Sequence, residues 1–185
     1  MTRSTFDAAI RFAQELIRIP SPPGGEGAVA ARLRDELDHL GFDGVTVDDT
    51  GSVRGVVRGN EAGPSVMLSC HLDVVAEGDP DEWEHPPFSG AIADGFLHGR
   101  GAMDIKGPLA LQVYAAAALQ GRAPGDVWVA HTVFEERGGL GMKRLMESGA
   151  VKPDVVVIGE STHGDICVGH RGRGELEVVL HGLAG

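Results

Sequence analysis

Apolar residues recur every three to four positions in four segments of the chain, and this spacing marks one buried face of an α-helix. The first segment has Ser4 or Thr5 as a candidate N-cap and stops at the Pro/Gly-rich run 20–25, while Gly41 follows the second. The pattern predicts helices over residues 6–17, 29–40, 109–117 and about 140–148.

Short runs rich in valine and isoleucine lie between and after these segments, and they predict strands at 45–47, 53–57, 65–70, 127–134, 154–158, 166–168 and 175–180. The runs 65–70 and 154–158 are typical of strands that are buried on both faces. Alternating strands and helices predict an α/β fold, a three-layer sandwich around a mainly parallel mixed sheet.

The stretch 76–100 has no regular pattern, and a loop this long in a compact domain is usually functional or disordered. Its aromatic residues favour an ordered loop. We expect Trp83, Phe88 and Arg100 to shape this loop rather than to contact a substrate.

Composition and charge exclude some classes of function. The chain has 185 residues, enough for one core, and a net charge of −11 argues against nucleic-acid binding. Cys70 and Cys167 lie in apolar runs, where buried free thiols are expected. No apolar run approaches the roughly 20 residues that span a bilayer, and no signal-peptide pattern begins the chain. We therefore expect a cytoplasmic protein without membrane partners.

One histidine and five carboxylates lie at positions where an α/β fold usually binds its ligands. In open α/β sheets, ligands gather outside the carboxyl ends of the strands, and most of these residues follow a predicted strand. The aspartate at position 104 instead precedes the third predicted helix. The set is His71, Asp73, Asp104, Glu135, Glu136 and Glu160.

Taken singly, these residues leave alternatives open. In His71-x-Asp73 the acid can accept the spare ring N–H of a metal-bound imidazole, but a structural histidine has the same pattern. Glu135-Glu136 can be a solvated turn, because adjacent acids repel each other unless they are exposed or neutralised. In the functional interpretation, one binds a metal and the other acts as general base.

Several blocks in order carry a family resemblance: SCHLDVV, WEHPPFSG, DGFLHGRGAMDIKGPLA, TVFEERGGLG, VVIGEST and GHRGRGELEVVLHG. They cover most of residues 65–185. The sequence resembles the co-catalytic zinc amidohydrolases and metallopeptidases that include acetylornithine deacetylase, succinyl-diaminopimelate desuccinylase, aminoacylase and glutamate carboxypeptidase. The resemblance implies a zinc-peptidase-like catalytic domain.

The resemblance also implies a role for each residue. His71 and Glu160 match ligands of one metal, Glu136 matches a ligand of the second, and Asp104 matches the aspartate that bridges both. Glu135 matches the general base, and Asp73 matches the acid that orients the histidine. The peptide bond after Asp104 is then a candidate for the cis form.

The implied reaction is metal-dependent hydrolysis of an amide bond in N-acyl amino acids or short peptides. Two Zn²⁺ per full-length subunit are implied, with Co²⁺ or Mn²⁺ as substitutes. The family also has a distal histidine ligand and an inserted dimerisation (lid) domain, through which a full-length parent forms a homodimer.

The residues from Glu175 resemble the entrance to that inserted domain. We therefore expect an N-terminal part of the catalytic domain over 1–174 and the start of the dimerisation domain over 175–185, so that the fold is truncated before the lid. Without the distal histidine, we expect this chain alone to bind metal weakly and to catalyse little.

Three alternatives compete with the enzyme. The first is a non-catalytic metal-binding or interaction domain of the same fold. The second is a thiol hydrolase that uses Cys70 and His71, although neighbouring strand residues point to opposite faces. The third is a nucleotide-binding protein, suggested by Gly99-Arg100-Gly101 and by 169–174, but neither glycine run has Rossmann or Walker A spacing.

Overall fold

The computed structural model describes residues 2–172, 174 and 176–182. Two short turns, η1 (Pro80–Glu82) and η2 (Ala102–Lys106), interrupt the regular elements. In chain order, the helices and strands are α1 (Arg3–Ile17), α2 (Gly27–His39), β1 (Asp43–Val47), β2 (Val53–Val57), β3 (Val66–His71), β4 (Ala91–Ala93), β5 (Phe96–His98), α3 (Gly107–Ala117), β6 (Val127–Thr132), α4 (Leu140–Ser148) and β7 (Val155–Ile158).

Five of the strands form one mixed sheet in the order β1-β2-β6-β3-β7. The strands β6, β3 and β7 are parallel, whereas β2 pairs antiparallel with β6 and β1 pairs antiparallel with β2. The register pairs His71 with Thr132 and Ser69 with Ile158. As a result, the carboxyl ends of β3, β6 and β7 lie at the same edge of the sheet.

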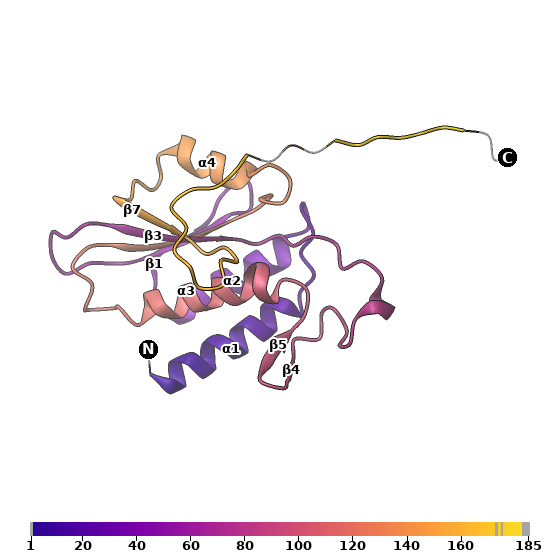
Figure 1. Ribbon diagram of the computed structural model, residues 1–185. Helices are drawn as coiled ribbons and strands as arrows, with labels where there is room; N and C mark the ends of the chain where they lie inside the picture. The colour runs from indigo at the N-terminus through magenta and orange to yellow at the C-terminus, as the bar shows by residue number, and fades with distance from the viewer. Residues whose placement is uncertain (1, 173, 175, 183–185) are drawn as a thin grey trace.

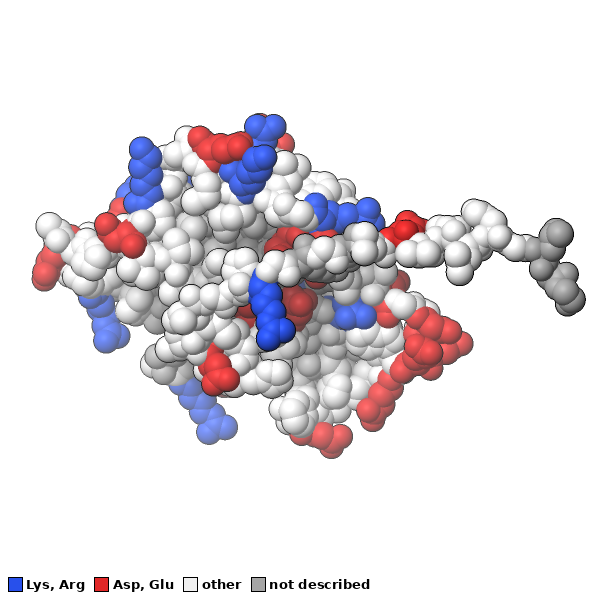
Figure 2. Space-filling model, turned by 45° about the horizontal axis from the view of Figure 1, so that its top comes forward, with Lys and Arg blue, Asp and Glu red and all other residues white. Residues whose placement is uncertain are grey.

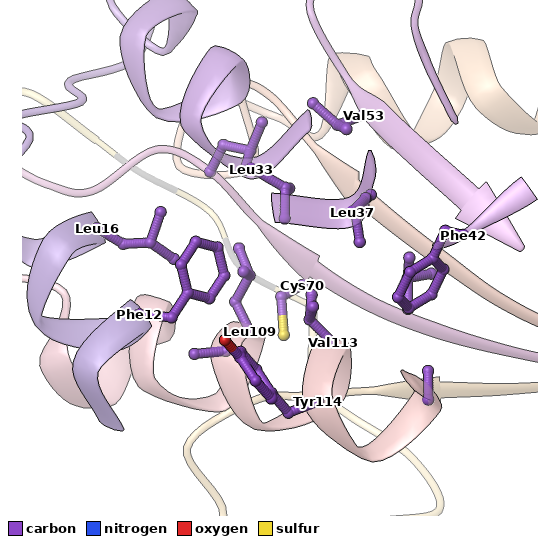
Figure 3. Packing of buried hydrophobic residues seen from close by; sticks show 14 of the residues in the cluster. Phe12, Leu16, Leu33, Leu37, Phe42, Val53, Cys70, Leu109, Val113 and Tyr114 are labelled. Atoms are coloured by element: carbon purple, nitrogen blue, oxygen red, sulfur yellow. The ribbon is translucent and has the colours of Figure 1, made fainter. Parts of the chain in front are cut away.

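Helices cover both faces of this sheet. In Figure 1, α1, α2 and α3 lie on one side of the sheet and α4 lies on the other. The larger core fills the space between the three helices and the sheet, with Phe12, Leu33 and Leu109 fully buried (Figure 3). A smaller cluster that includes Met67 and Leu145 joins α4 to the opposite face. The predicted three-layer sandwich is confirmed.

The first helix begins earlier than the sequence predicted. The N-cap is Thr2, whose side-chain oxygen accepts a hydrogen bond from the Thr5 N–H at 3.2 Å, and not Ser4 or Thr5. Phe6, which the pattern placed on the buried stripe, is 47% exposed. It lines a surface groove with Met103 and Leu111 because the first turn of α1 projects beyond the core.

The loop 76–100 is ordered, as its aromatic residues indicated. The Trp83 indole donates a hydrogen bond to the Glu77 carbonyl oxygen at 2.9 Å, and the Arg100 guanidinium lies 5.0 Å from the centre of the Trp83 ring. The loop also contains the β4–β5 hairpin. The sequence did not predict this hairpin because strands of three residues carry too little alternation.

Four expectations for the C-terminal part were wrong. The side chains of β7 are 45–59% exposed, because β7 is an edge strand that pairs only with β3 in the described sheet. Residues 166–168 form no strand, since no described segment pairs with their backbone, and Cys167 is exposed with them. The described residues 176–180 are likewise not a strand.

Near the C-terminus, the described residues 176–182 extend away from the body (Figure 1). Glu175, where the second predicted domain begins, lies outside the described residues. The division of the chain at 174/175 stays a prediction.

Candidate metal site

The six residues singled out in the sequence lie at one edge of the sheet. His71 is the last residue of β3, Glu135 and Glu136 follow β6, and Glu160 follows β7. Asp104 lies in η2, immediately before α3.

Their donor atoms fall into two groups around the imidazole. His71, Asp104 and Glu160 offer ligand atoms within 4.8 Å of one another, and so do His71, Glu135 and Glu136. Figure 2 shows acidic side chains gathered in the middle of one face of the molecule, beside the extended C-terminal segment. The histidine is buried and the acids reach solvent, so the site presents carboxylates at the surface and a nitrogen donor beneath them.

Hydrogen bonds fix the orientation of the His71 ring. Its Nδ1 lies 2.8 Å from the Asp73 carbonyl oxygen, which can only accept, so Nδ1 carries the proton and donates. The other nitrogen, Nε2, lies 3.0 Å from Oδ1 of Asp104. Burial alone lowers the pKa of His71, but the hydrogen bonds with Asp104 and Asp73 outweigh it and raise the pKa to about 10. Nε2 is therefore the nitrogen that would bind a metal, and it would have to lose its proton to do so.

Asp73 acts mainly on the backbone beyond β6. Its carboxylate accepts the N–H of Glu135 on one oxygen and the N–H of Glu136 on the other, each at 3.0 Å. The same carboxylate lies 3.5 Å from Nδ1 of His71, farther than its own backbone carbonyl oxygen. Burial raises the pKa of Asp73, but the bonds from His71, Glu136 and Glu135 lower it overall, so the carboxylate stays ionised.

Asp104 reaches the site through a tight turn. The Asp104–Ile105 peptide bond is cis, as the resemblance implied, and Gly101 precedes it with φ 82°. A Cβ at Gly107 would lie 2.2 Å from the Ala102 carbonyl oxygen, so only glycine fits where the turn meets α3. The hydrogen bond from His71 lowers the pKa of Asp104.

Two of the acids have the electrostatics of a cation-binding site, since their pKa values are raised. Burial raises the pKa of Glu136, and the nearby Asp104 raises it further. Burial also raises the pKa of Glu160, with further contributions from Asp104 and the two glutamates after β6. A bound cation removes this penalty because it offsets the mutual repulsion of the acids.

The donor set fits a divalent metal. It combines one imidazole nitrogen, whose other nitrogen is hydrogen-bonded, with carboxylate oxygens from three further segments of the chain. Nitrogen and carboxylate donors of this kind suit Zn²⁺, with Mn²⁺ and Co²⁺ as alternatives.

Three buried polar side chains beside the site drew no attention in the sequence: Ser21, Glu26 and Lys106. The Lys106 ammonium donates a hydrogen bond to the Ile19 carbonyl oxygen at 2.6 Å, and burial lowers its pKa to about 8. The only signal in the sequence was a polar residue beside a Gly- or Pro-rich turn, a pattern that also occurs at ordinary solvated turns.

The geometry contradicts the thiol hydrolase. The Cys70 thiol donates to Oε1 of Gln112 at 3.3 Å, on the face of β3 opposite His71, and burial raises the pKa of the thiol. The glycine runs give no support to nucleotide binding either. Gly99 and Gly101 form the turn before Asp104, and no helix follows 169–174 among the described residues.

Comparison with known proteins decides the family. Residues 67–181, more than half of the chain, match the peptidase family M20/M25/M40. The chain belongs to this family. The family resemblance that the sequence blocks indicated is therefore confirmed for this M20 family chain. The matched range includes every candidate site residue.

Two relatives and one solved structure illustrate the similarity. The chain is 32% identical to the uncharacterized protein YgeY of Escherichia coli, over 94% of this chain and 44% of YgeY. It is 33% identical to a succinyl-diaminopimelate desuccinylase of Methylorubrum extorquens, over 95% of this chain and 50% of that protein. An M20 family metallo-carboxypeptidase from Sulfolobus solfataricus shares the fold, with a TM-score of 0.74 at 23% identity over 86% of this chain and 37% of the other.

The chain thus spans half or less of the length of these proteins. In the part that the structure describes, no helix combines the length and the apolar composition needed to cross a bilayer.

Proposed function

We propose that this chain carries most of the metal site of an amide-bond hydrolase. The observation that carries the proposal is the convergence of carboxylates from three segments on Nε2 of one buried histidine. Because the chain spans half or less of its relatives' length, the activity is proposed for a protein of their length that contains it.

In this proposal, His71, Asp104 and Glu160 would hold one divalent metal, and Asp104 and Glu136 would hold a second. Bound divalent cations supply Lewis acidity, which activates water and polarises a carbonyl group. Glu135 accepts a proton from the attacking water and delivers it to the leaving amine. Asp73 supports Glu135 by holding its backbone N–H.

The proposed substrates are N-acyl amino acids or short peptides, and the proposed metal is Zn²⁺. The names of two relatives, a desuccinylase and a metallo-carboxypeptidase, support this substrate class. The homodimer and the cytoplasmic location stay predictions.

The first test is metal binding by residues 1–185, measured by calorimetric titration with Zn²⁺. The proposal requires binding that His71→Ala removes and that an exposed substitution such as His39→Ala leaves unchanged. Absence of binding both by residues 1–185 and by a protein of the relatives' length would exclude the site. A protein of the relatives' length that binds Zn²⁺ but cleaves no member of a panel of N-acyl amino acids and dipeptides would favour the non-catalytic metal-binding domain.

A further inference from the structure

The connection between α1 and α2, which has no predicted site residue, contacts three of the four backbone segments that carry the site. This connection covers residues 19–26. Its Ile19 carbonyl oxygen accepts from Lys106, two residues after Asp104. Its Ser21 binds the segment after β3, accepting the Val74 N–H at 2.9 Å and donating its hydroxyl to the Leu72 carbonyl oxygen at 2.8 Å.

The third contact is made by Glu26, a buried carboxylate with 4% of its surface exposed. One oxygen accepts the Gly24 N–H at 2.8 Å, and the other accepts the Phe134 N–H at 3.2 Å. No described residue forms an ion pair with Glu26. Burial of a carboxylate is costly without strong hydrogen-bond partners. These two N–H groups therefore stabilise the buried Glu26 side chain.

Phe134 is the residue immediately before the proposed base, and its backbone is unusual. It has φ 57°, a left-handed conformation that non-glycine residues rarely adopt and that the surroundings must enforce. Its ring also lies close to the turn before Glu26, because a Cβ at Gly24 would lie 3.6 Å from that ring.

Two buried carboxylates therefore bind three successive N–H groups beyond β6. Glu26 binds that of Phe134, and Asp73 binds those of Glu135 and Glu136. Asp73 binds the N–H groups of Glu135 and Glu136 but not that of Phe134, the residue at which the chain turns. Without Glu26, the peptide before Phe134 keeps only the bond that its Val133 carbonyl oxygen accepts from the Gly141 N–H at 3.1 Å, so we expect it to rotate more readily toward negative φ and to move both glutamates together.

We propose that Glu26 is a positioning residue, whose carboxylate holds the Phe134 turn and thereby aims Glu135 and Glu136 into the metal site. This inference rests on the proposed function. In this proposal, Glu26 positions the two glutamates through the hydrogen bonds that both of its oxygens accept, and not through a long-range effect of its charge.

The test compares Glu26→Gln with Glu36→Gln in residues 1–185. Glutamine keeps the size of Glu26, but its amide NH₂ cannot accept one of the two N–H groups. Glu36 is the matched control, since it is a buried glutamate of α2 that pairs with Arg32 and Tyr114 instead of the site. Both variants are expected to lower the melting temperature, so stability alone does not distinguish them.

Two readouts distinguish them. In Glu26→Gln, amide hydrogen exchange of the peptide covering 133–137 becomes faster than in the control. Co²⁺ titration followed by visible absorption shows an altered spectrum and roughly tenfold weaker binding, as substitutions of residues that support metal ligands typically cause.

Each outcome is decisive. If unsubstituted residues 1–185 do not bind Co²⁺, the comparison is repeated in a protein of the relatives' length, and absence of binding there overturns the proposed function and the positioning role together. If the unsubstituted protein binds but Glu26→Gln matches Glu36→Gln in exchange and in Co²⁺ spectrum, the positioning role alone is overturned.

Discussion

At the scale of the residue, the site depends on which atom of Asp73 faces the His71 ring. The backbone carbonyl oxygen takes the proton of Nδ1, which leaves Nε2 directed at Asp104. The carboxylate of Asp73 is then free to bind the backbone N–H groups of Glu135 and Glu136. One residue thus connects the imidazole donor to the acids after β6.

The adjacent glutamates Glu135 and Glu136 are expected to have different functions, the first as general base and the second as metal ligand. In a protein of the relatives' length, Glu135→Ala should lower kcat by about 10²–10⁴, the usual contribution of a general base, while metal content stays unchanged. Elemental analysis and steady-state kinetics on the same sample measure both. Glu147→Ala, an exposed position in α4, serves as control. Near-normal turnover of the Glu135 variant would exclude it as the base.

The proposed ligands are expected to behave in the opposite way. His71→Ala and Asp104→Ala should each lower the metal-to-protein ratio measured after dialysis, because each removes a donor atom from the cluster. His39→Ala, at the exposed end of α2, should leave the ratio unchanged. A full complement of metal in the Asp104 variant would show that the metal lies elsewhere.

At the scale of the element, the turn η2 and the start of α3 set the position of Asp104. The turn closes with the Lys106 N–H donating to the Gly101 carbonyl oxygen at 2.7 Å, and α3 then packs against α1 and the sheet. Helix α3 is apolar enough to be predicted from sequence, but the path of the turn depends on close approach at Gly107.

Gly107→Ala should therefore destabilise the fold by about 1–3 kcal/mol, the usual cost of overpacking, because its Cβ meets the Ala102 carbonyl oxygen at 2.2 Å. Urea unfolding of residues 1–185 measures the change. Gly27→Ala is the matched control, since nothing lies within 4 Å of its Cβ in the first turn of α2. Equal stability of the two variants would contradict the close approach.

At the scale of the whole molecule, the centre of the sheet contains an uncharged histidine. His131 in β6 is fully buried, its Nδ1 accepts the Cys70 N–H at 3.2 Å, and its Nε2 has no hydrogen-bond partner among the described residues. Burial lowers the pKa of His131 from 6.5 to about 3. Protonation of this ring therefore opposes folding of the whole sheet.

The sign of the pH effect follows from this shift. Between about pH 6.5 and pH 3 the unfolded chain binds a proton at His131 that the folded chain does not, so the free energy of unfolding falls as the pH is lowered. The slope from this group is at most about 1.4 kcal/mol per pH unit.

His131→Gln should remove this contribution. The difference in unfolding free energy between the original chain and the variant should then shrink as the pH falls from 6.5 to 4, as measured by urea unfolding at each pH. Taking the difference cancels the acids of the site, which titrate in both proteins. A difference that stays constant over this range would contradict the low pKa of His131.

Much of the fold could be predicted from the sequence because periodicity reports burial directly. The helices and central strands have strong apolar patterns, and they appear within a few residues of the expected positions. The edge strand β7 and residues 166–168 were misjudged because an apolar run has the same composition whether or not another element covers it. The β4–β5 hairpin was too short to carry a pattern.

For the site, the sequence by itself determined which residue types stand at the strand ends, and those gave the six candidates. Only the tertiary structure decided which of their atoms meet, because parallel pairing of β3 with β6 and β7 brings together residues up to 89 positions apart. It also decided the supporting contacts of Glu26 and Asp73 with backbone N–H groups. Such contacts leave no sequence signal, since every residue except proline offers the same N–H.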